Sequence, residues 1–416
     1  MNFLYNFAIG TYIQGIKAAA TFGHQKAMQM EMGRDQWEEV VAEKLAELKK
    51  SCPNPRFIWF HAASLGEFEQ GRPLIEQLRE KYPEYQILLT FFSPSGYEVR
   101  KNYKGADVIC YLPYDKPSYA RKFIDLVNPE KVFFVKYEFW GNMLQELNRR
   151  NIPTYLISGI FRENQVFFKW YGGMMRPILG LFQHLFVQDE TSKTLLEKVN
   201  VKNVTICGDT RFDRVLSIQQ QAKQYQWAAD FRATSDFILV AGSSWPKDED
   251  ILLEHFNSHP EMKLIIAPHE IHEEHIQGII SKLKRPYMRY SKLDESKVKD
   301  VDCIIIDAIG FLSSIYRYGD VAYIGGGFGV GIHNTLEAAV YGIPVVFGPN
   351  HTAFREALGL LEVGGGFTIS DAAGYASVMK TFMTDNAKLK DAGAKAGAYV
   401  KDNSGASDAI FSAVFK

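Results

Sequence analysis

Short apolar segments alternate with amphipathic, helix-like segments along most of this 416-residue chain. A short apolar run between polar or turn-forming residues is typical of a strand that is buried on both faces. Strands that alternate with helices build parallel sheets covered by helices on both sides. The alternation therefore predicts an α/β fold.

The strand candidates fall into two series with a polar stretch between them. Those of the first series are residues 57–60, 86–91, 107–111, 131–135, 153–157, 184–187 and 203–207. Those of the second series are residues 236–242, 263–268, 303–307, 321–326 and 344–348. Two such series predict two doubly wound, Rossmann-like domains, which also agrees with a length too great for one ordinary domain.

The domain boundaries follow from these series. We expect a membrane-associating segment over 1–22, a first domain over 23–214 and a partly helical linker over 215–235. The second domain is predicted over 236–395. The final stretch, 396–416, is predicted to form a helix that crosses back onto the first domain.

Composition narrows the class of protein. Lys and Arg number 47 against 48 Asp and Glu, which argues against general nucleic-acid binding, since that usually needs a basic excess. The four cysteines are far apart in sequence, at Cys52, Cys110, Cys207 and Cys303. Without a C-x-x-C pair, a cysteine zinc site or redox motif is not indicated, and a reducing cytoplasm is the simplest location.

The first 22 residues are apolar and aromatic, but they contain Asn2, Asn6, Gln14 and Lys17. The segment has no basic start and no cleavage site, so it is not a secretory signal. It matches a spanning helix poorly, because such a helix needs about 20 mostly apolar residues. A helix lying in the membrane interface fits better, and a first helix packed on the core is the alternative.

One acid, Glu67, stands in a turn of otherwise small residues between the strand candidate 57–60 and an amphipathic helix. In open α/β sheets, ligands bind at the edge where strands lead into helices. Glu67 therefore lies where chemistry is usually carried out. The alternative is an ordinary acid in a first helical turn, which the helix dipole stabilises.

The sharpest motif is the glycine-rich sequence YIGGGFGVGIHNTLEAAVYGIPVVFGP, residues 323–349. Glycines let backbone N–H groups come close to a phosphate, and the N-terminus of a following helix attracts the anion. We expect His333 and Asn334 to open that helix, and Glu337 to accept hydrogen bonds from ribose hydroxyls. The motif matches neither the G-x-G-x-x-G fingerprint nor a P-loop. It predicts a nucleotide-binding loop, with plain tight turns as the alternative.

Five further motifs precede this loop. They are HAASLGE (61–67), LLTFFSPSG (88–96), VKYEFW (135–140), SGIFRE (158–163) and GDTRFD (208–213). Together with the glycine-rich loop, they make the chain resemble bacterial 3-deoxy-D-manno-octulosonic acid (Kdo) transferases, glycosyltransferases of the B fold. The resemblance covers most of the chain. It implies two Rossmann-like domains facing each other across a cleft, the first binding the acceptor and the second the CMP-sugar donor.

The resemblance implies transfer of Kdo from CMP-Kdo to a lipid A precursor, in lipopolysaccharide core biosynthesis at the cytoplasmic face of the inner membrane. Glu67 is then the general base for the acceptor hydroxyl. Because CMP-Kdo is β-linked and the product α-linked, a single inverting displacement is implied. CMP carries one phosphate, so no metal and no other cofactor is expected. The implied partners are the two substrates and the membrane surface, with no nucleic acid.

The resemblance also assigns residues to the two substrates. On the acceptor side these are Ser64, Gly66, Ser93, Ser95, Gly96, Glu138 and Arg162. On the donor side they are Arg211, Gly242, Ser243, Pro268, His269, Glu270, Gly310, Gly326, Gly327, Phe328, His333, Asn334 and Glu337. For Glu138, a structural carboxylate and a substrate contact are equally open. Arginine suits anionic groups because its planar fork binds them at two points.

The chain departs from the family pattern at three places. YEFWG (137–141), PHE (268–270) and DAIGFL (307–312) stand where the family usually has T-E-L-W-P, R-H-P-E and D-T-x-G-E-L. The family residues that are missing from this chain are on the donor side.

Two stretches look like metal motifs without fitting them. DED (248–250) precedes an apolar helix, where first-turn acids are favoured by the dipole. HEIHEEH (269–275) spaces its histidines by three, whereas the zincin signature needs a spacing of four. We interpret His269 and Glu270 as cleft residues and the rest of this stretch as an exposed helix face.

The aromatic stretch 161–182 is predicted to meet lipid or acyl chains, with Lys169 and Arg176 at lipid phosphates; a core helix with a glycine break is the alternative. Three other functions stay open. They are a UDP-sugar-dependent glycosyltransferase of the same fold, a UDP-sugar 2-epimerase, and a membrane-bound nucleotide-binding protein without turnover. The apolar N-terminal segment disfavours the epimerase, which has no use for it.

Overall fold

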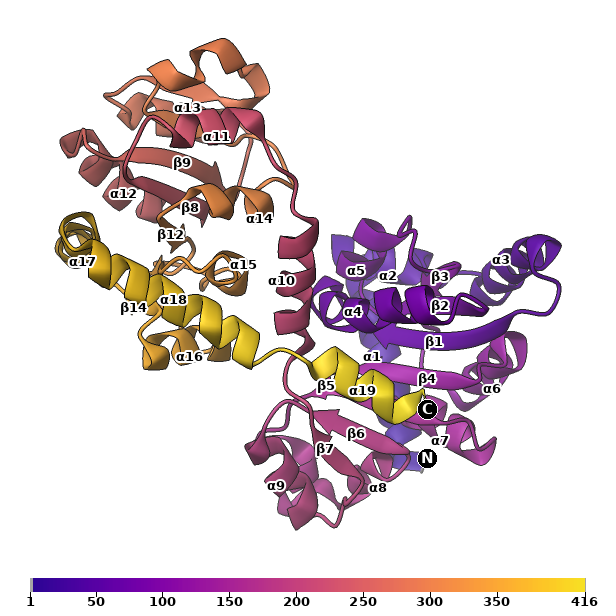
Figure 1. The fold of residues 1–416 in the computed structure, drawn as a ribbon. Helices are drawn as coiled ribbons and strands as arrows, with labels where there is room; N and C mark the ends of the chain where they lie inside the picture. The colour runs from indigo at the N-terminus through magenta and orange to yellow at the C-terminus, as the bar shows by residue number, and fades with distance from the viewer. Residues whose placement is uncertain (1–2, 416) are drawn as a thin grey trace. The chain divides into compact units, whose positions relative to one another are not determined.

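The computed structural model describes residues 3–415 and divides the chain into two compact units. The first unit extends to Arg214 and resumes at Gly405, and the second is Val215–Ser404. Each unit is built on a seven-stranded parallel sheet (Figure 1). The predicted fold class, α/β with two doubly wound domains, is confirmed. Of the predicted membrane segment 1–22, residues 1 and 2 lie outside the described residues.

The first sheet has the strand order β3-β2-β1-β4-β5-β6-β7. Its strands are β1 Arg56–Ala62, β2 Tyr85–Phe91, β3 Val108–Tyr111, β4 Lys131–Val135, β5 Thr154–Gly159, β6 His184–Val187 and β7 Val204–Ile206. All seven lie where the apolar runs predicted them. The winding reverses between β1 and β4, and the carboxyl ends of these two strands form the switch point at which such sheets bind ligands.

Helices cover both faces of the first sheet. They are α1 Phe3–Thr21, α2 Gln25–Met32, α3 Trp37–Ser51, α4 Leu65–Lys81, α5 Pro94–Arg100, α6 Pro117–Val127, α7 Gly141–Arg149, α8 Arg176–Leu179, α9 Glu190–Lys198 and α19 Ala406–Val414, with 3₁₀ turns at Val166–Phe168 and Trp170–Met174. Successive strand residues point to opposite faces. Trp59 therefore packs in the core with α3, α6 and α7, while Ile58 and Phe60 pack with α4 and α19.

The second sheet has the order β10-β11-β9-β8-β12-β13-β14. Its strands are β8 Ile238–Ser244, β9 Lys263–Pro268, β10 Tyr287–Arg289, β11 Cys303–Ile305, β12 Val321–Ile324, β13 Val345–Phe347 and β14 Gly366–Thr368. The sequence did not predict the two edge strands, β10 and β14, which have three residues each. Here the switch point lies between β8 and β12, so their carboxyl ends are the expected ligand edge.

The helices of the second unit pack on this sheet. They are α11 Gln226–Arg232, α12 Pro246–Ser258, α13 Glu273–Lys282, α14 Leu312–Ile315, α15 Leu336–Ala339, α16 Arg355–Val363, α17 Ala372–Thr384 and α18 Asn386–Asp402, with 3₁₀ turns at Tyr290–Lys292, Glu295–Asp300 and Tyr316–Tyr318. One helix, α10 Thr210–Gln221, begins in the first unit and ends in the second.

Two predicted boundaries differ from the structure. Residues 215–235, predicted as a linker, form the rest of α10 and helix α11, and α11 buries Trp227 and Phe231 in the second unit. The boundary at 396 falls inside α18, and the chain returns to the first unit only at Gly405. The apolar side chains of α11 make it part of a core, which polar composition alone did not reveal.

Helix α1 is attached to the first unit by one of its faces. Tyr5, Ile13 and Ile16 are buried, and the Tyr5 hydroxyl donates to the buried Asp115 carboxylate at 2.6 Å. Other side chains of α1 are strongly exposed, among them Phe3 at 82% and Phe7 at 65%. Within residues 3–415, no helix has both the length and the apolar character needed to cross a membrane.

Candidate functional site

Glu67 lies at the switch point of the first sheet, in the first turn of α4, which follows β1 directly. Its side chain is half-buried, and the hydroxyl of Ser64 donates a hydrogen bond to its carboxylate. Ser64 is the N-cap residue, yet its side chain accepts no backbone N–H. The serine therefore orients the carboxylate instead of capping the helix. Gly66, between them in sequence, is exposed.

The turn after β2 packs beside this turn. The Ser93 N–H donates to the Ala63 carbonyl at 2.7 Å, and the hydroxyls of Ser93 and Ser95 lie 3.0 Å apart. A side chain at Gly96 would collide with the Phe91 ring and approach the Ser64 backbone. Glycine is therefore needed for α5 to come this close. The structure thus brings two motifs that are distant in sequence, at Glu67 and at Ser93–Gly96, to one edge.

Glu138 follows β4 and is buried, with 8% of its surface exposed. Trp140 Nε1 donates to its Oε2 atom at 2.6 Å, and His61 Nε2 lies 3.0 Å from the same oxygen. His61 Nδ1 lies 2.8 Å from the Thr90 hydroxyl, which accepts from Trp59 Nε1. His61 Nδ1 also lies 3.2 Å from the Thr90 carbonyl oxygen, and Trp140 Nε1 lies 3.2 Å from His61 Nε2. Side chains, not backbone, hold Glu138 in place.

A mostly apolar cavity of about 390 Å³ lies near this segment. Its lining includes Tyr137 and Phe139, the neighbours of Glu138, together with Arg162 and Phe167. Arg162 is exposed, whereas Phe167 is buried at 4%. The prediction that 161–182 meets lipid is therefore wrong for Phe167, whose ring packs against Phe139 instead.

Arg211 lies in the part of α10 that belongs to the first unit. Its guanidinium is paired with Asp209, with Nε to Oδ2 at 2.8 Å and Nη2 to Oδ2 at 2.7 Å. Asp209 also accepts from the amide of Gln70 on α4. The arginine predicted for the donor is thus fixed by a neighbouring acid on the unit that carries Glu67.

At the ligand edge of the second sheet, β8 ends in Gly242 and Ser243. A side chain at Gly242 would collide with the Tyr316 hydroxyl, and Ser243 has a left-handed backbone with φ of 52°. In the turn that follows, the buried Asp248 accepts from the N–H of Trp245 at 2.9 Å and from that of Gly326 at 2.8 Å. The first acid of DED therefore joins β8 to the glycine-rich loop.

Three rings stack above this edge. The centroids of His269 and Trp245 are 4.7 Å apart, and those of His269 and His333 are 4.5 Å apart. Trp245 Nε1 donates to His333 Nε2 at 3.2 Å, so this nitrogen carries no proton. Burial, and then the neighbouring His269, lower the pKa of His333, which favours the neutral ring. The stack forms a flat aromatic surface beside the loop.

The glycine-rich loop needs several of its glycines. A side chain at Gly327 would lie 2.5 Å from the Gly348 backbone, and Gly326 has φ of +92°. The helix expected to open at His333 begins only at Leu336 and lasts one turn, because the Asn334 side chain accepts from the Leu336 N–H. The predicted start of the helix at His333 is therefore wrong by three residues, and an anion site at this loop stays a prediction.

The remaining predicted donor residues surround this edge. Asn334 is exposed, and its amide donates to Glu337 at 3.0 Å. Phe328 lines an apolar cavity of about 290 Å³ together with Trp245. Pro268 is the last residue of β9, and Gly310, with φ of +92°, lies in an exposed turn after β11. Since β11 is two strands from β8, Gly310 lies farther along the edge.

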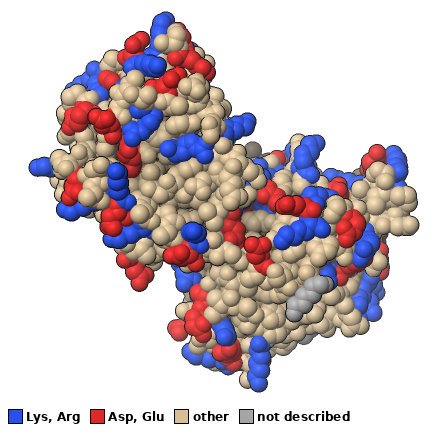
Figure 2. All heavy atoms as spheres, in the orientation of Figure 1, with Lys and Arg blue, Asp and Glu red and all other residues tan. Residues whose placement is uncertain are grey.

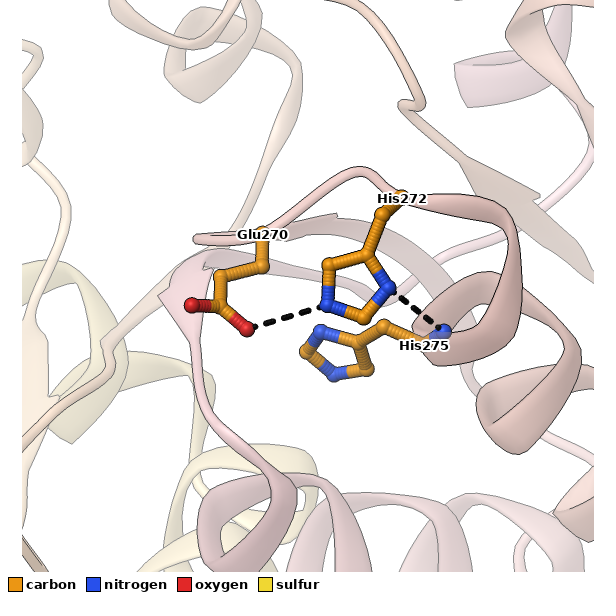
Figure 3. Close-up of side chains that lie close together, drawn as sticks. All are labelled: Glu270, His272 and His275. Atoms are coloured by element: carbon orange, nitrogen blue, oxygen red, sulfur yellow. Dashed lines mark hydrogen bonds and ion pairs between the residues drawn. The ribbon is translucent and has the colours of Figure 1, made fainter.

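Glu270 lies in a small cluster with two histidines, shown in Figure 3. His272 Nε2 is 3.1 Å from the Glu270 carboxylate, and both residues are exposed. His275 is different, because its side chain is 7% exposed and its Nε2 lies 2.9 Å from both carboxylate oxygens of the buried Glu249. The interpretation of this stretch as an exposed helix face is wrong for His275.

Sequence reasoning missed His61, Trp245 and the Glu249–His275 pair. His61 is the first residue of the motif HAASLGE, and Trp245 directly follows the end of β8. Their positions at the ends of strands, where ligands bind in such sheets, could have identified both residues as site candidates. The pairing of Glu249 with His275 joins two helices and had no signal in sequence.

Comparison with known proteins gives a consistent answer. Residues 37–214 match the family model described as 3-deoxy-D-manno-octulosonic-acid transferase (kdotransferase). The 3-deoxy-D-manno-octulosonic acid transferase of Aquifex aeolicus is 27% identical over 352 residues, which are 83% of this chain and 90% of the relative. Those of Haemophilus influenzae and Chlamydophila psittaci are 26% and 28% identical, and the alignments cover 78% and 82% of this chain and 78% and 80% of the relatives.

Solved structures resemble the chain in fold. The UDP-GlcNAc 2-epimerase of Neisseria meningitidis has a TM-score of 0.60 at 15% identity and covers 86% of this chain and 98% of its own. A putative UDP-N-acetylglucosamine 2-epimerase of Listeria monocytogenes has a TM-score of 0.59 at 12% identity, covering 87% and 96%. The fold does not separate epimerase from transferase, but the sequence relatives and the family model do. Residues 37–214 therefore match the 3-deoxy-D-manno-octulosonic acid transferase family, and the chain is similar to such transferases over most of its length.

Proposed function

We propose that the protein transfers Kdo from CMP-Kdo to a lipid A precursor, with Glu67 as general base. The observation that carries the proposal is a half-buried carboxylate oriented by Ser64 at the switch point of the first sheet, inside the region that matches the family model. A base must lie within hydrogen-bond reach of the proton that it removes. The small residues around Glu67 leave space for a sugar hydroxyl.

In the proposed step, an acceptor oxygen forms a bond to the anomeric carbon of Kdo while the bond from that carbon to the CMP phosphate oxygen breaks. The electron pair leaves with CMP, and the acceptor proton passes to Glu67. Attack opposite the leaving group inverts the configuration. The leaving group, CMP, carries a single phosphate, so the step as proposed needs no metal, and turnover should persist in the presence of a chelator.

The donor side of the proposal rests on the second unit. The stacked rings of Trp245, His269 and His333 offer a flat surface of the kind on which a base or sugar packs. The loop after β12 brings backbone N–H groups close to the same edge, as Gly326 and Gly327 require. These features suit a nucleotide, and we assign them to CMP.

We also propose that the protein lies on the cytoplasmic face of the inner membrane. On the first unit, Phe7, Phe22 and Trp170 are exposed at 65%, 89% and 91%. Figure 2 shows acidic and basic side chains mixed over the visible face of each unit. We propose that these exposed apolar side chains enter the interface, as in helices that lie on a membrane.

The test of transfer compares wild type with Glu67→Gln, which keeps the size of the side chain and an acceptor for Ser64. Labelled Kdo is supplied as CMP-Kdo generated in situ, and incorporation into a lipid A precursor is measured. We expect loss of transfer by about 100-fold or more with CMP binding retained. Glu80→Gln, an exposed acid farther along α4, is the matched control and should stay active. Undiminished transfer by Glu67→Gln refutes the assignment of the base.

If the wild type transfers no Kdo, the proposed substrate is wrong, and UDP-sugars are the next donors to test. Membrane attachment is tested separately by liposome flotation. We expect Phe7→Ser with Trp170→Ser to lower the bound fraction, and Val99→Ser, an exposed apolar residue on α5, to leave it unchanged. Equal flotation of all variants contradicts the proposed attachment.

A further inference from the structure

Three side chains at the start of α13 gather in a way that the proposed transfer reaction does not use. Glu270, His272 and His275 each bring a ligand atom to within 4.8 Å of the others, and Figure 3 shows the side chains directed toward one another. Neighbouring ligands of a tetrahedral zinc ion lie roughly 3.4 Å apart, given bonds of about 2.1 Å. The contact of 3.1 Å between Glu270 and His272 Nε2 is already in that range.

A second carboxylate, that of Glu249, holds His275 in place from outside the cluster. It is 1% exposed, it accepts from the Ser244 hydroxyl at 3.0 Å, and both its oxygens lie 2.9 Å from His275 Nε2. The proton of His275 is therefore held on Nε2, and Nδ1 keeps its lone pair for a metal. Histidines that bind metals almost always donate their other N–H to such a carboxylate, which fixes the ring.

Charge in the cluster also favours a cation. Within the described chain, the recorded ion pairs of Glu249 and Glu270 are with histidines and not with lysine or arginine. A helix N-terminus alone disfavours a cation. Here, however, the carboxylates of Glu249 and Glu270 offset the positive end of α13, while Glu273 in its first turn is neutralised by Arg289.

His272 has one interaction that competes with a metal. It is the N-cap residue of α13, and its Nδ1 accepts from the His275 N–H at 3.2 Å. Binding a metal through Nε2 moves the imidazole proton to Nδ1 and ends this hydrogen bond. A single hydrogen bond of that length is weak compared with a metal–nitrogen bond, and its loss does not prevent binding.

We propose that Glu270, His272 and His275 bind one divalent transition-metal ion of the zinc class, with Glu249 as the partner that orients His275. Two imidazoles and one carboxylate form a ligand set that zinc accepts, and they leave a fourth position open. Nitrogen ligands favour zinc, nickel or copper over magnesium and calcium. The resemblance assigned Glu270 to the donor, but the transfer step as proposed uses neither this carboxylate nor a bound ion.

The test is a zinc titration of the purified full chain, free of affinity-tag histidines, followed by calorimetry. The key variant is His272→Asn, because asparagine still caps α13 while the ligand is lost. The control is His24→Asn, which makes the same change at the histidine that caps α2. We expect one zinc ion bound by wild type and control, and binding weaker by more than about 100-fold in His272→Asn.

Two further measurements keep the result unambiguous. Glu249→Gln should weaken zinc binding by roughly 10- to 100-fold, as loss of an outer partner does. Zinc should raise the melting temperature of wild type but not of His272→Asn, and both should melt alike in chelator. Failure of wild type to bind zinc at about 10 µM overturns the proposal, as does equal zinc affinity in wild type and His272→Asn.

Discussion

The hydrogen bond from Trp140 to Glu138 can be tested by a double-mutant cycle. Trp140→Phe removes the Nε1–H that lies 2.6 Å from Oε2 but keeps a ring to stack on Phe92, whose centroid is 4.6 Å away. Glu138→Gln replaces the carboxylate by a neutral amide of the same shape, which still offers an oxygen. The cycle therefore isolates the charge-assisted part of the bond.

The expected magnitude follows from the nature of the acceptor. A hydrogen bond to a charged group contributes about 1.5–3 kcal/mol, and one between neutral groups contributes about 0.5–1.5 kcal/mol. Trp140→Phe should therefore cost more in the wild type than in Glu138→Gln, with a coupling free energy of about 1 kcal/mol. The burial of Glu138, 8% exposed, keeps water from replacing the lost donor.

The assay is hydrogen–deuterium exchange of peptides from β1 and β4, because a chain of two units does not unfold in one step. Exchange rates give the free energy of opening of each strand. Trp37→Phe, which changes a tryptophan of α3 with no recorded contact to Glu138, is the control and should have the same effect in both backgrounds. Additivity of Trp140→Phe and Glu138→Gln within about 0.3–0.5 kcal/mol refutes the reasoning.

Three more predictions concern other parts of the molecule. Burial lowers the pKa of His255 to about 4, so the unfolded state takes up the proton first as pH falls. The second unit should therefore lose about 2 kcal/mol of stability between pH 7 and pH 5, and hydrogen–deuterium exchange of α12 peptides, corrected for the intrinsic rate, should lack this loss in His255→Leu. Gly327→Ala should abolish CMP binding in calorimetry, since its Cβ would lie 2.5 Å from backbone, whereas Gly329→Ala, in open space, should not. Tyr5→Phe, which removes the 2.6 Å bond to Asp115, should speed exchange in α1 by about 10- to 100-fold, and an unchanged rate contradicts that role.

The sequence predicted the central strands well because they are long apolar runs. β4, for example, is KVFFV, and burial on both faces leaves no other use for such a segment. The edge strands β10 and β14 have three residues each and little apolar pattern, so nothing in the sequence distinguished them from loops. Strand ends then placed Glu67 and the glycine-rich loop at ligand edges, as the structure shows.

What the sequence could not give are the contacts between elements. Trp245, His269 and His333 come from three different segments, and only the sheet order places their rings together. The start of α15 was missed by three residues, and the Asn334 side chain accepts from the Leu336 N–H at this point. Side-chain partners of this kind depend on the tertiary fold, which local pattern does not contain.

The return of the chain to the first unit has a consequence for biosynthesis. Ile410, Phe411 and Val414 belong to the core that covers one face of the first sheet, yet they are translated after the whole second unit. During synthesis, the first sheet therefore emerges from the ribosome before α19 is available to cover this face. The nascent first unit is expected to stay incompletely folded, and open to chaperones, until these residues emerge. A chain that is truncated near residue 400 would therefore have a defective core in the first unit, although that unit is synthesised first.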